Sequence, residues 1–277
     1  MATVDDESIH YRIIANVSEL HACVKLQKQV WGPDTITSMQ QMRAAILHGG
    51  SVIGAFCGEA LVGFCYSFIG YDGREPYVGS HMMAIQPEYR DRGIGMRLKL
   101  EQRLWAMEAG YGKIVWTFDP FESRNGYLNI VKLGGTVSAY IPEFYGTDDA
   151  GFPTDRFVVT WDLSSERVFR AIGGQQERGD ETSGYPRLLT VEGAGGQLSD
   201  VGVVQAARRD LIGTTSRVRL PIPRFASKLR QARPDIYQIW QRGVRDLAMA
   251  AFAHGYQIVS CHPSEPETLD YILEMKR

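Results

Sequence analysis

A glycine turn at residues 90–95 is the part of the sequence whose residue types point most directly to chemistry. It reads Arg-Asp-Arg-Gly-Ile-Gly, follows an apolar stretch ended by Pro87, and leads into a predicted helix. Glycine permits a tight turn with exposed backbone N–H groups, and a helix N-terminus adds about half a positive charge. Arg90, Arg92 and Arg97 add guanidinium groups that fit phosphate oxygens. The segment therefore predicts a phosphate-binding turn.

Other interpretations of this turn fit less well. The sequence contains no GxxxxGK(S/T), which excludes a Walker loop. The spacing is RxxGxG rather than GxGxxG, and the expected strand order differs from that of a dinucleotide-binding fold. A plain helix cap is the structural alternative, but it does not account for three arginines around two loop glycines.

The turn lies in a stretch whose hydrophobic periodicity alternates between that of strands and that of helices. This alternation predicts a mixed α/β fold. Ser18 is the expected N-cap of the first helix. We expect strands at residues 11–15, 51–57, 61–69, 78–85, 113–118, 136–141 and 156–163, and helices at 18–30, 38–48, 95–109 and 121–133.

The turn and the order of the elements resemble the GNAT superfamily of acyl-CoA N-acyltransferases. A strand, Pro87-Glu88-Tyr89, the RxxGxG turn and a long helix are similar to that family's acyl-CoA motif, and the element order extends the resemblance over residues 10–162. The resemblance implies a mixed, mostly antiparallel sheet with splayed central strands. It also implies acetyl-CoA or another acyl-CoA as cosubstrate.

The same resemblance implies which residues hold the coenzyme. In the family, backbone amides of the turn bind the pyrophosphate, and the strand before it pairs with the pantetheine arm. An asparagine at the start of a later helix often contacts the pantetheine, although Asn125 is equally typical of a helix cap. Carried over to this sequence, the coenzyme-binding residues are Met83, Ala84, Ile85, Arg90, Arg92, Gly93, Ile94, Gly95, Met96 and Asn125.

Several further segments look like one GNAT group that has a C-terminal extension and no assigned substrate. The resemblance to this group implies the fold and the cofactor but not the acceptor. The segments are Ser80-His81, Leu98-Lys99, Gln102-Arg103, residues 116–120, Arg124-Asn125 and residues 132–134.

Acyl transfer to an amine needs a proton acceptor, oxyanion donors and an acid for the leaving thiolate. GNAT enzymes commonly carry a carboxylate base on the strand before the turn, and residues 78–85 contain none. His81 is the candidate base there, and the two-residue strand period places it on the same face as Met83 and Ile85. A histidine hydrogen-bonded within the core is the alternative. Asp119 is a second candidate, as base or as amine anchor, or else a turn residue before proline.

The acid is not fixed by the motif. The family's tyrosine stands four residues before a glycine, and Ile130 occupies that position relative to Gly134. Tyr127 and Tyr145 are the candidate acids, with Tyr140 as a further hydroxyl, and packing is the alternative role for each.

These features predict direct transfer of an acyl group, with acetyl foremost, from coenzyme A to a primary amine. No covalent enzyme intermediate is expected, although Cys65 is not excluded as a nucleophile. The missing carboxylate and tyrosine favour a different class as the alternative: a non-catalytic acyl-CoA-binding or sensor module with a degenerate site.

The composition changes after residue 163, and residues 173–184 contain no apolar side chain. We expect a GNAT-like domain at 1–165, a linker at 166–186 and a smaller α/β domain at 187–277. That domain should hold strands at 217–222, 257–261 and 271–275 and a helix at 241–254, and should extend or flank the first sheet and wall the acceptor cleft. Residues 100–115 and 241–259 share a helix–Gly-Tyr–strand pattern, which indicates a degenerate half-repeat or a common junction.

Composition limits the class of protein. The 277 residues carry a formal net charge of −2, which gives no global attraction to nucleic acid or membrane. No apolar run reaches the roughly 18 residues of a membrane span, and the first ten residues lack the apolar core of a signal peptide. Four cysteines without CxxC spacing suit the reducing cytoplasm, and no metal ligand spacing is present. Homo-oligomerisation stays open.

Overall fold

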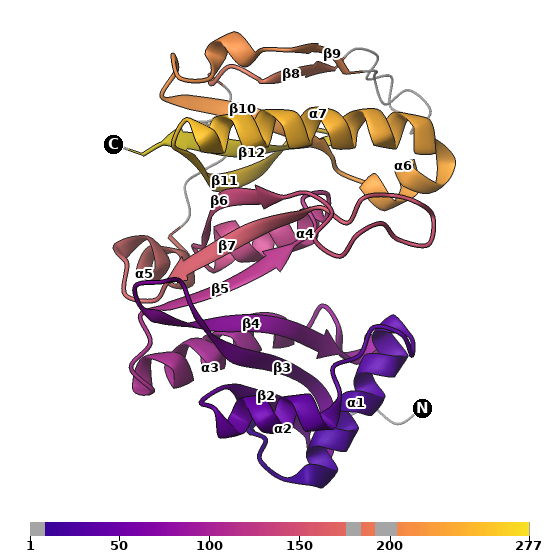
Figure 1. Cartoon of the computed structure of the whole chain (residues 1–277), viewed down its shortest axis with the longest axis vertical. Coiled ribbons are helices and arrows are strands. Elements are labelled where there is room, and N and C mark those ends of the chain that lie inside the picture. Colours follow the sequence, from indigo (N-terminus) through magenta and orange to yellow (C-terminus); the bar gives the residue numbers. More distant parts are fainter. Residues whose placement is uncertain (1–8, 176–183, 192–203, 277) are drawn as a thin grey trace. The chain divides into compact units, whose positions relative to one another are not determined.

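The computed structural model describes residues 9–175, 184–191 and 204–276. The chain divides into two compact units, Met1–Trp116 and Thr117–Arg277 (Figure 1). This division falls within strand β5 (Lys113–Phe118). Helix α5 (Glu166–Ile172) lies at the start of the expected linker, residues 166–186. No helix in the described parts of the chain has both the length and the apolar character needed to cross a bilayer.

A sheet in the order β1-β2-β3-β4-β5 forms the centre of the first unit. The pairs β1–β2, β2–β3 and β3–β4 are antiparallel, and β5 is parallel to β4. The expected mixed, mostly antiparallel sheet is therefore confirmed. Its other elements are β1 (Ile9–Ile13), α1 (Val17–Trp31), α2 (Met39–Leu47), β2 (Ser51–Cys57), β3 (Ala60–Tyr71), β4 (Pro76–Ile85), the short 3₁₀ helix η1 (Pro87–Tyr89) and α3 (Ile94–Glu108).

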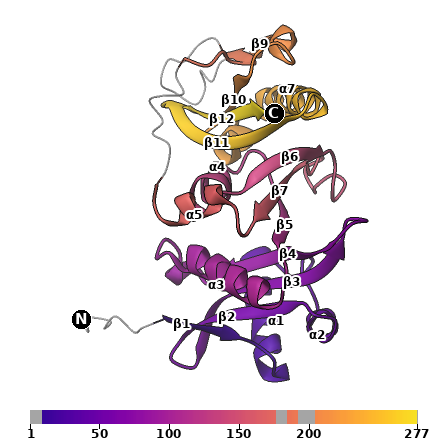
Figure 2. The ribbon, with the colours of Figure 1, turned by 90° about the vertical axis from the view of Figure 1, so that its left-hand side faces the viewer.

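Helices cover both faces of this sheet (Figure 2). Because successive strand residues point to opposite faces, Phe64 and Tyr66 of β3 pack in the cluster that contains α1 and α2. Cys65, between them, packs in the other cluster, together with Ile94 and Leu98 of α3. A side chain of β4 can therefore be assigned to one face of the sheet from the β3 residue with which it pairs.

Two local features differ from the sequence-based expectations. Asn16 rather than Ser18 caps α1, because its Oδ1 accepts the Glu19 N–H at 2.8 Å. The helix expected at 121–133 is a single turn, α4 (Ser123–Gly126), followed by the π-helical segment η2 (Tyr127–Lys132).

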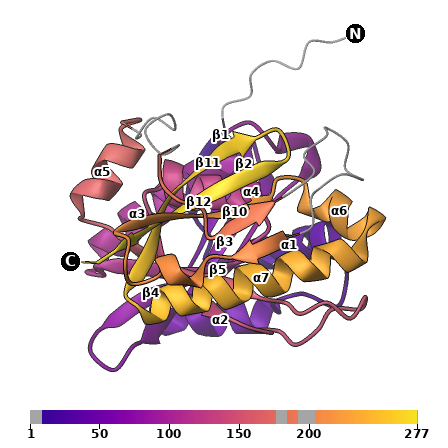
Figure 3. The ribbon, with the colours of Figure 1, turned by 90° about the horizontal axis from the view of Figure 1, so that it is seen from above.

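The second unit contains a sheet in the order β7-β6-β11-β12-β10, all antiparallel. Ile258 of β11 pairs with Val137 of β6, so the C-terminal strands extend the sheet of β6 and β7, as the sequence predicted. Helix α7 packs on β6, β10 and β11. Figure 3 shows α7 beside β10. The elements are β6 (Thr136–Ile141), β7 (Arg156–Asp162), β8 (Leu189–Val191), β9 (Val204–Ala207), η5 (Arg209–Leu211), β10 (Arg217–Pro223), α6 (Ala226–Ala232), α7 (Pro234–Ala253), β11 (Tyr256–Glu265) and β12 (Thr268–Met275).

A buried carboxylate fastens α7 to the segment between β6 and β7. The Asp155 side chain is 1% exposed. Arg245 of α7 donates to both of its oxygens at 2.8 and 3.1 Å. The Tyr140 hydroxyl donates at 2.5 Å and the Glu143 N–H at 3.0 Å. Four hydrogen bonds from three segments therefore converge on one buried charge. Burial raises the pKa of Tyr140, and the Asp155 carboxylate raises it further.

Replacement of Arg245 should destabilise the protein, because the Asp155 carboxylate would stay buried without this cation. We expect Arg245→Met to lower the free energy of unfolding by about 3 kcal/mol, measured by urea denaturation. Arg242→Met is the matched control, because Arg242 lies exposed on the same helix. The control should change stability by less than about 0.5 kcal/mol. Equal losses in both variants would contradict this role of the ion pair.

Candidate functional site

The pairing between β4 and β5 is confined to two positions in the first unit. Val78 pairs with Ile114 and Gly79 with Val115. Pairing of β4 with β3 continues to Ile85, but among the described residues no β5 partner follows Gly79. Residues 80–85 of β4 therefore carry backbone N–H and C=O groups, on the side away from β3, for which the sheet provides no partner. This is the expected splay of the central strands, and an extended ligand could pair there.

The turn after β4 ends in a helix N-terminus without a side-chain cap. Gly93 is the N-cap of α3 and has φ +77°, in the left-handed region that favours glycine. The first turn of α3 contains no acidic residue, so its backbone N–H groups and dipole favour an anion from elsewhere. Gly95 differs, because it lies inside α3; a Cβ there would lie 3.3 Å from Ile85 Cδ1. Gly93 therefore provides the left-handed backbone conformation of the turn, and Gly95 lets α3 lie close to the Ile85 side chain.

The arginines of the turn have different surroundings. Arg90 and Arg92 are exposed. Arg90 Nε donates to the Ile85 carbonyl at 3.4 Å, and the Arg92 guanidinium lies 5.1 Å from the Tyr89 ring centroid. Neither contact involves a carboxylate, so both guanidinium groups can pair with a bound anion. Arg97 instead pairs with Glu101 at 2.6 Å.

His81 lies on the face of the sheet opposite to the one expected. Tyr66 pairs with Met82 and Ser67 with Ser80, so His81 is the extra residue of a β-bulge. Its ring lies 6.1 Å from Tyr66 and 5.9 Å from Phe68, on the α1 and α2 face.

Met83 and Ile85 pack on the α3 face, so the expectation that they share a face with His81 is wrong. The bulge interrupts the two-residue period on which that expectation rested. The His81 side chain reaches solvent, yet partial burial against the rings lowers its pKa below the ordinary value near 6.5.

A buried lysine lies under this bulge, and the sequence had not indicated any role for it. Lys99 of α3 is 3% exposed. Its Nζ donates to Ser80 Oγ and Gln102 Oε1, both at 2.9 Å, and lies 3.8 Å from the Trp116 ring centroid. These partners favour the ammonium form, but exclusion of water outweighs them and lowers the pKa of Lys99 to about 7.

Lys99 should therefore make stability depend on pH in a defined direction. Between the pKa of Lys99 in the folded chain, about 7, and its ordinary value of 10.5, the unfolded chain binds a proton that the folded chain lacks. The free energy of unfolding of the wild type, minus that of Lys99→Met, should therefore rise by roughly 2–4 kcal/mol between pH 7 and pH 10. Denaturant titrations at several pH values measure this difference. Lys25→Met, at an exposed position of α1, should differ from the wild type by the same free energy of unfolding at every pH. If the difference between the wild type and Lys99→Met is also independent of pH, the buried-lysine interpretation is contradicted.

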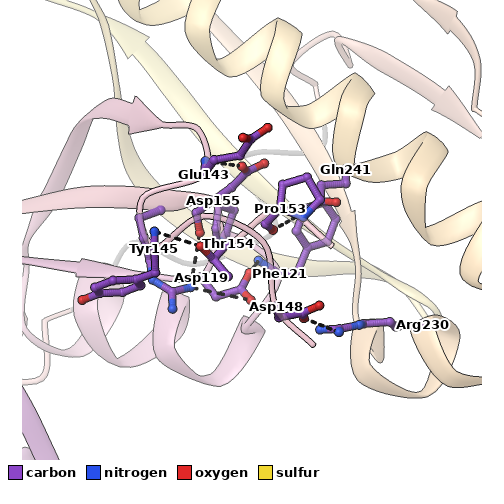
Figure 4. A network of polar contacts seen from close by, with 12 residues as sticks. Asp119, Phe121, Glu143, Tyr145, Asp148, Pro153, Thr154, Asp155, Arg230 and Gln241 are labelled. Carbon is purple, nitrogen blue, oxygen red and sulfur yellow. Dashed lines mark hydrogen bonds and ion pairs between the residues drawn. The ribbon is translucent and has the colours of Figure 1, made fainter. Parts of the chain in front are cut away.

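The other predicted site residues lie in the second unit. Asp119 Oδ1 accepts the Phe121 N–H at 2.8 Å, and its Oδ2 lies 3.9 Å from Arg156 Nη1. Burial raises the pKa of Asp119, and Arg156 opposes that shift. The same Arg156 guanidinium lies 5.3 Å from the Tyr145 ring centroid, so it brings Asp119 and Tyr145 into one group (Figure 4).

The structure places Asn125 and Tyr127 at the surface. Asn125 is exposed within α4, whose N-cap is Glu122, so the alternative role of Asn125 as a cap is not observed. Tyr127 is 38% exposed at the start of η2, with Lys132 Nζ 5.6 Å from its ring centroid. The Tyr140 hydroxyl is committed to Asp155, which leaves the exposed Tyr127 and Tyr145 as the candidate acids.

Cysteine and metal chemistry receive no positive indication. Cys65 is buried, and burial raises its pKa to about 12, so it carries almost no thiolate at neutral pH. Among the residues that the structure describes, no three His, Cys, Asp or Glu side chains are grouped closely enough to hold a metal ion.

A pocket beside Asp119 was not predicted from the sequence. It has a volume of about 370 Å³, and it lies entirely within the second unit. Its walls come from the segment after β5, from the loop between β6 and β7, and from α6 and α7, which are more than 100 residues from Asp119 in the chain. Besides Asp119, it is lined by Phe121, Glu122, Phe152, Arg230 and Tyr237.

Sequence comparison assigns the family of the N-terminal part. Residues 20–128 match the model of the Acetyltransferase (GNAT) family. This part of the chain is thus a GNAT acetyltransferase domain, the type of domain found in acyltransferase enzymes. A search of curated proteins finds no match to the chain.

Solved structures of low sequence identity are also similar to the chain. NAA60 from Arabidopsis thaliana, solved with acetyl-CoA, is 16% identical, with 57% of this chain and 100% of that chain covered and a TM-score of 0.48. An acetyltransferase of the GNAT family from Streptococcus pneumoniae is 15% identical, with 55% and 98% covered and a TM-score of 0.46. An N-acetyltransferase from Staphylococcus aureus is 14% identical, with 57% and 99% covered and a TM-score of 0.45. The family assignment rests on the sequence match.

Proposed function

We propose that the protein transfers an acyl group, with acetyl foremost, from a coenzyme A thioester to a primary amine by direct attack. The observation that carries the proposal is the uncapped N-terminus of α3 beside the unpaired stretch of β4. These two features offer donors for a pyrophosphate and an edge for an amide-containing arm, which are the two parts of coenzyme A. A reducing compartment, the cytoplasm, suits the four free cysteines.

In this proposal the residues of the first unit hold the coenzyme. The pyrophosphate would accept hydrogen bonds from the N–H groups of Ile94, Gly95 and Met96 and pair with Arg90 and Arg92. Ile94 is buried in the core with Leu98, which fixes the turn in place. The pantetheine arm would pair with the backbone of residues 83–85 and contact Asn125.

The proton-transfer roles belong to a small set of candidates. A group that accepts the ammonium proton must reach the amine, and His81 and Asp119 are the proposed acceptors. Burial lowers the pKa of His81 below 6.5, so its imidazole is neutral and able to accept a proton at neutral pH. Burial raises the pKa of Asp119, which makes that carboxylate a stronger proton acceptor. Tyr127 and Tyr145 are the proposed donors to the leaving thiolate.

The alternative function, a non-catalytic acyl-CoA-binding module, shares the coenzyme site and differs only in chemistry. An assay of free thiol released from acetyl-CoA over a panel of primary amines separates the two. Amine-dependent thiol release supports transfer, whereas coenzyme binding without thiol release for any amine supports the module.

Strain at Gly93 should weaken coenzyme binding. A side chain in the left-handed region costs about 1–2 kcal/mol, and more for a β-branched residue. We therefore expect Gly93→Val to weaken the affinity for coenzyme A roughly 10-fold or more, measured by isothermal titration calorimetry.

Gly73→Val is the matched control for this change. Gly73 has φ +91° and, like Gly93, would have no heavy atom within 4 Å of an added Cβ. It lies in the connection between β3 and β4, away from the turn, so it should suffer similar strain and keep its coenzyme affinity. Unchanged affinity in Gly93→Val, or an equal loss in Gly73→Val, would refute the proposed coenzyme site.

A further inference from the structure

The pocket beside Asp119 combines an aromatic wall with carboxylates. The Tyr237 ring centroid lies 5.3 Å from that of Phe121 and 5.4 Å from that of Phe152. These three rings therefore form one continuous apolar surface. Asp119 and Glu122 line the same pocket, whose volume of about 370 Å³ is near the lower limit for sites that bind small molecules.

The cation that lines the pocket is already paired. Arg230 forms an ion pair with Asp148, and its guanidinium stacks 4.4 Å from the Phe152 ring centroid. Asp119 forms an ion pair with Arg156 at 3.9 Å, which is beyond hydrogen-bonding distance, so its carboxylate can still accept a hydrogen bond from a ligand. The pocket therefore presents a surplus of negative charge next to apolar rings.

Burial is the largest cause of the raised pKa values of Asp119 and Glu122, and the charge of Asp119 raises that of Glu122 further. Arg156 lowers both pKa values but does not cancel these shifts. A ligand cation placed between them would offset both effects, because an opposite charge favours the ionised carboxylate.

The pocket is held in shape by contacts that do not involve a ligand. Asp119 is oriented by the Phe121 N–H at 2.8 Å. Asp148 Oδ1 accepts the N–H groups of Ala150 and Phe152, both at 3.0 Å, and so orders the loop that carries Phe152. Gln241 of α7 donates to the Pro153 carbonyl at 2.8 Å (Figure 4). Both walls are therefore fixed before any ligand enters.

We propose that this pocket binds the acceptor as a small primary ammonium with an aromatic or similar apolar body. The ammonium would donate to the Asp119 carboxylate, and the body would contact Phe121, Phe152 and Tyr237. Glu122 would add a second negative charge near the ammonium. The inference rests on the proposed function, because it names the class of amine that the acyltransferase accepts.

Binding of 2-phenylethylamine to the full-length protein, measured by isothermal titration calorimetry without coenzyme, tests this inference. The neutral analogue 2-phenylethanol and the small cation ethylamine isolate the contributions of charge and ring. Wild-type protein should bind 2-phenylethylamine more tightly than either analogue. Asp119→Asn should weaken 2-phenylethylamine binding roughly 10- to 100-fold and leave 2-phenylethanol binding unchanged.

The substituted side chain can keep its structural hydrogen bond, since an asparagine oxygen still accepts the Phe121 N–H. Asp34→Asn, an exposed position between α1 and α2, is the matched control and should bind as wild type does. Phe152→Leu should weaken binding of the amine and the alcohol together. Absence of 2-phenylethylamine binding to wild type, or equal binding to Asp119→Asn, would overturn the inference.

Coenzyme A titrations on the same proteins distinguish this failure from failure of the proposed function. If coenzyme A binds and the amine does not, the acceptor inference is overturned and the proposed function stands. If the amine binds through Asp119 and coenzyme A does not bind, the ammonium pocket is supported and the proposed acyl transfer fails.

Discussion

The candidate coenzyme site depends on how little β4 pairs with β5. Two residue pairs hold the strands together, and after Gly79 the β4 backbone continues with β3 alone. A fully paired β4 would bury the backbone groups of residues 80–85 in the sheet. It would also leave no edge beside the N-terminus of α3. The partial pairing places an unpaired strand edge and an uncapped helix N-terminus at the two ends of one short connection, residues 86–93.

The bulge at His81 has a second consequence for the same strand. It turns His81 toward Tyr66 and Phe68, while Ser80 contacts Lys99 on the α3 face. Ser80 and His81 therefore point to opposite faces of the sheet at the position where the pairing between β4 and β5 ends. A buried lysine with its pKa near neutrality thus lies directly beneath the strand that we propose to hold the pantetheine arm.

Much of the fold could be predicted from the sequence, because most elements follow simple periods. Strands β2, β5 and β6 have the bounds that their apolar runs and flanking glycines indicated. The face of His81 could not be predicted, since a one-residue bulge leaves no mark in the hydrophobic pattern. The coenzyme turn carries its chemistry in consecutive residues, which the sequence shows directly. The pocket beside Asp119 joins segments distant in the chain, and its walls become visible only when Arg230, Gln241 and Arg245 are seen to contact the loop between β6 and β7.

The most direct test of the coenzyme site is hydrogen–deuterium exchange of the full-length protein with and without coenzyme A. The proposed coenzyme site predicts slower exchange in two segments on binding, the unpaired stretch of β4 at residues 80–85 and the first turn of α3 at residues 94–96. Coenzyme binding that leaves exchange in both segments unchanged would contradict it.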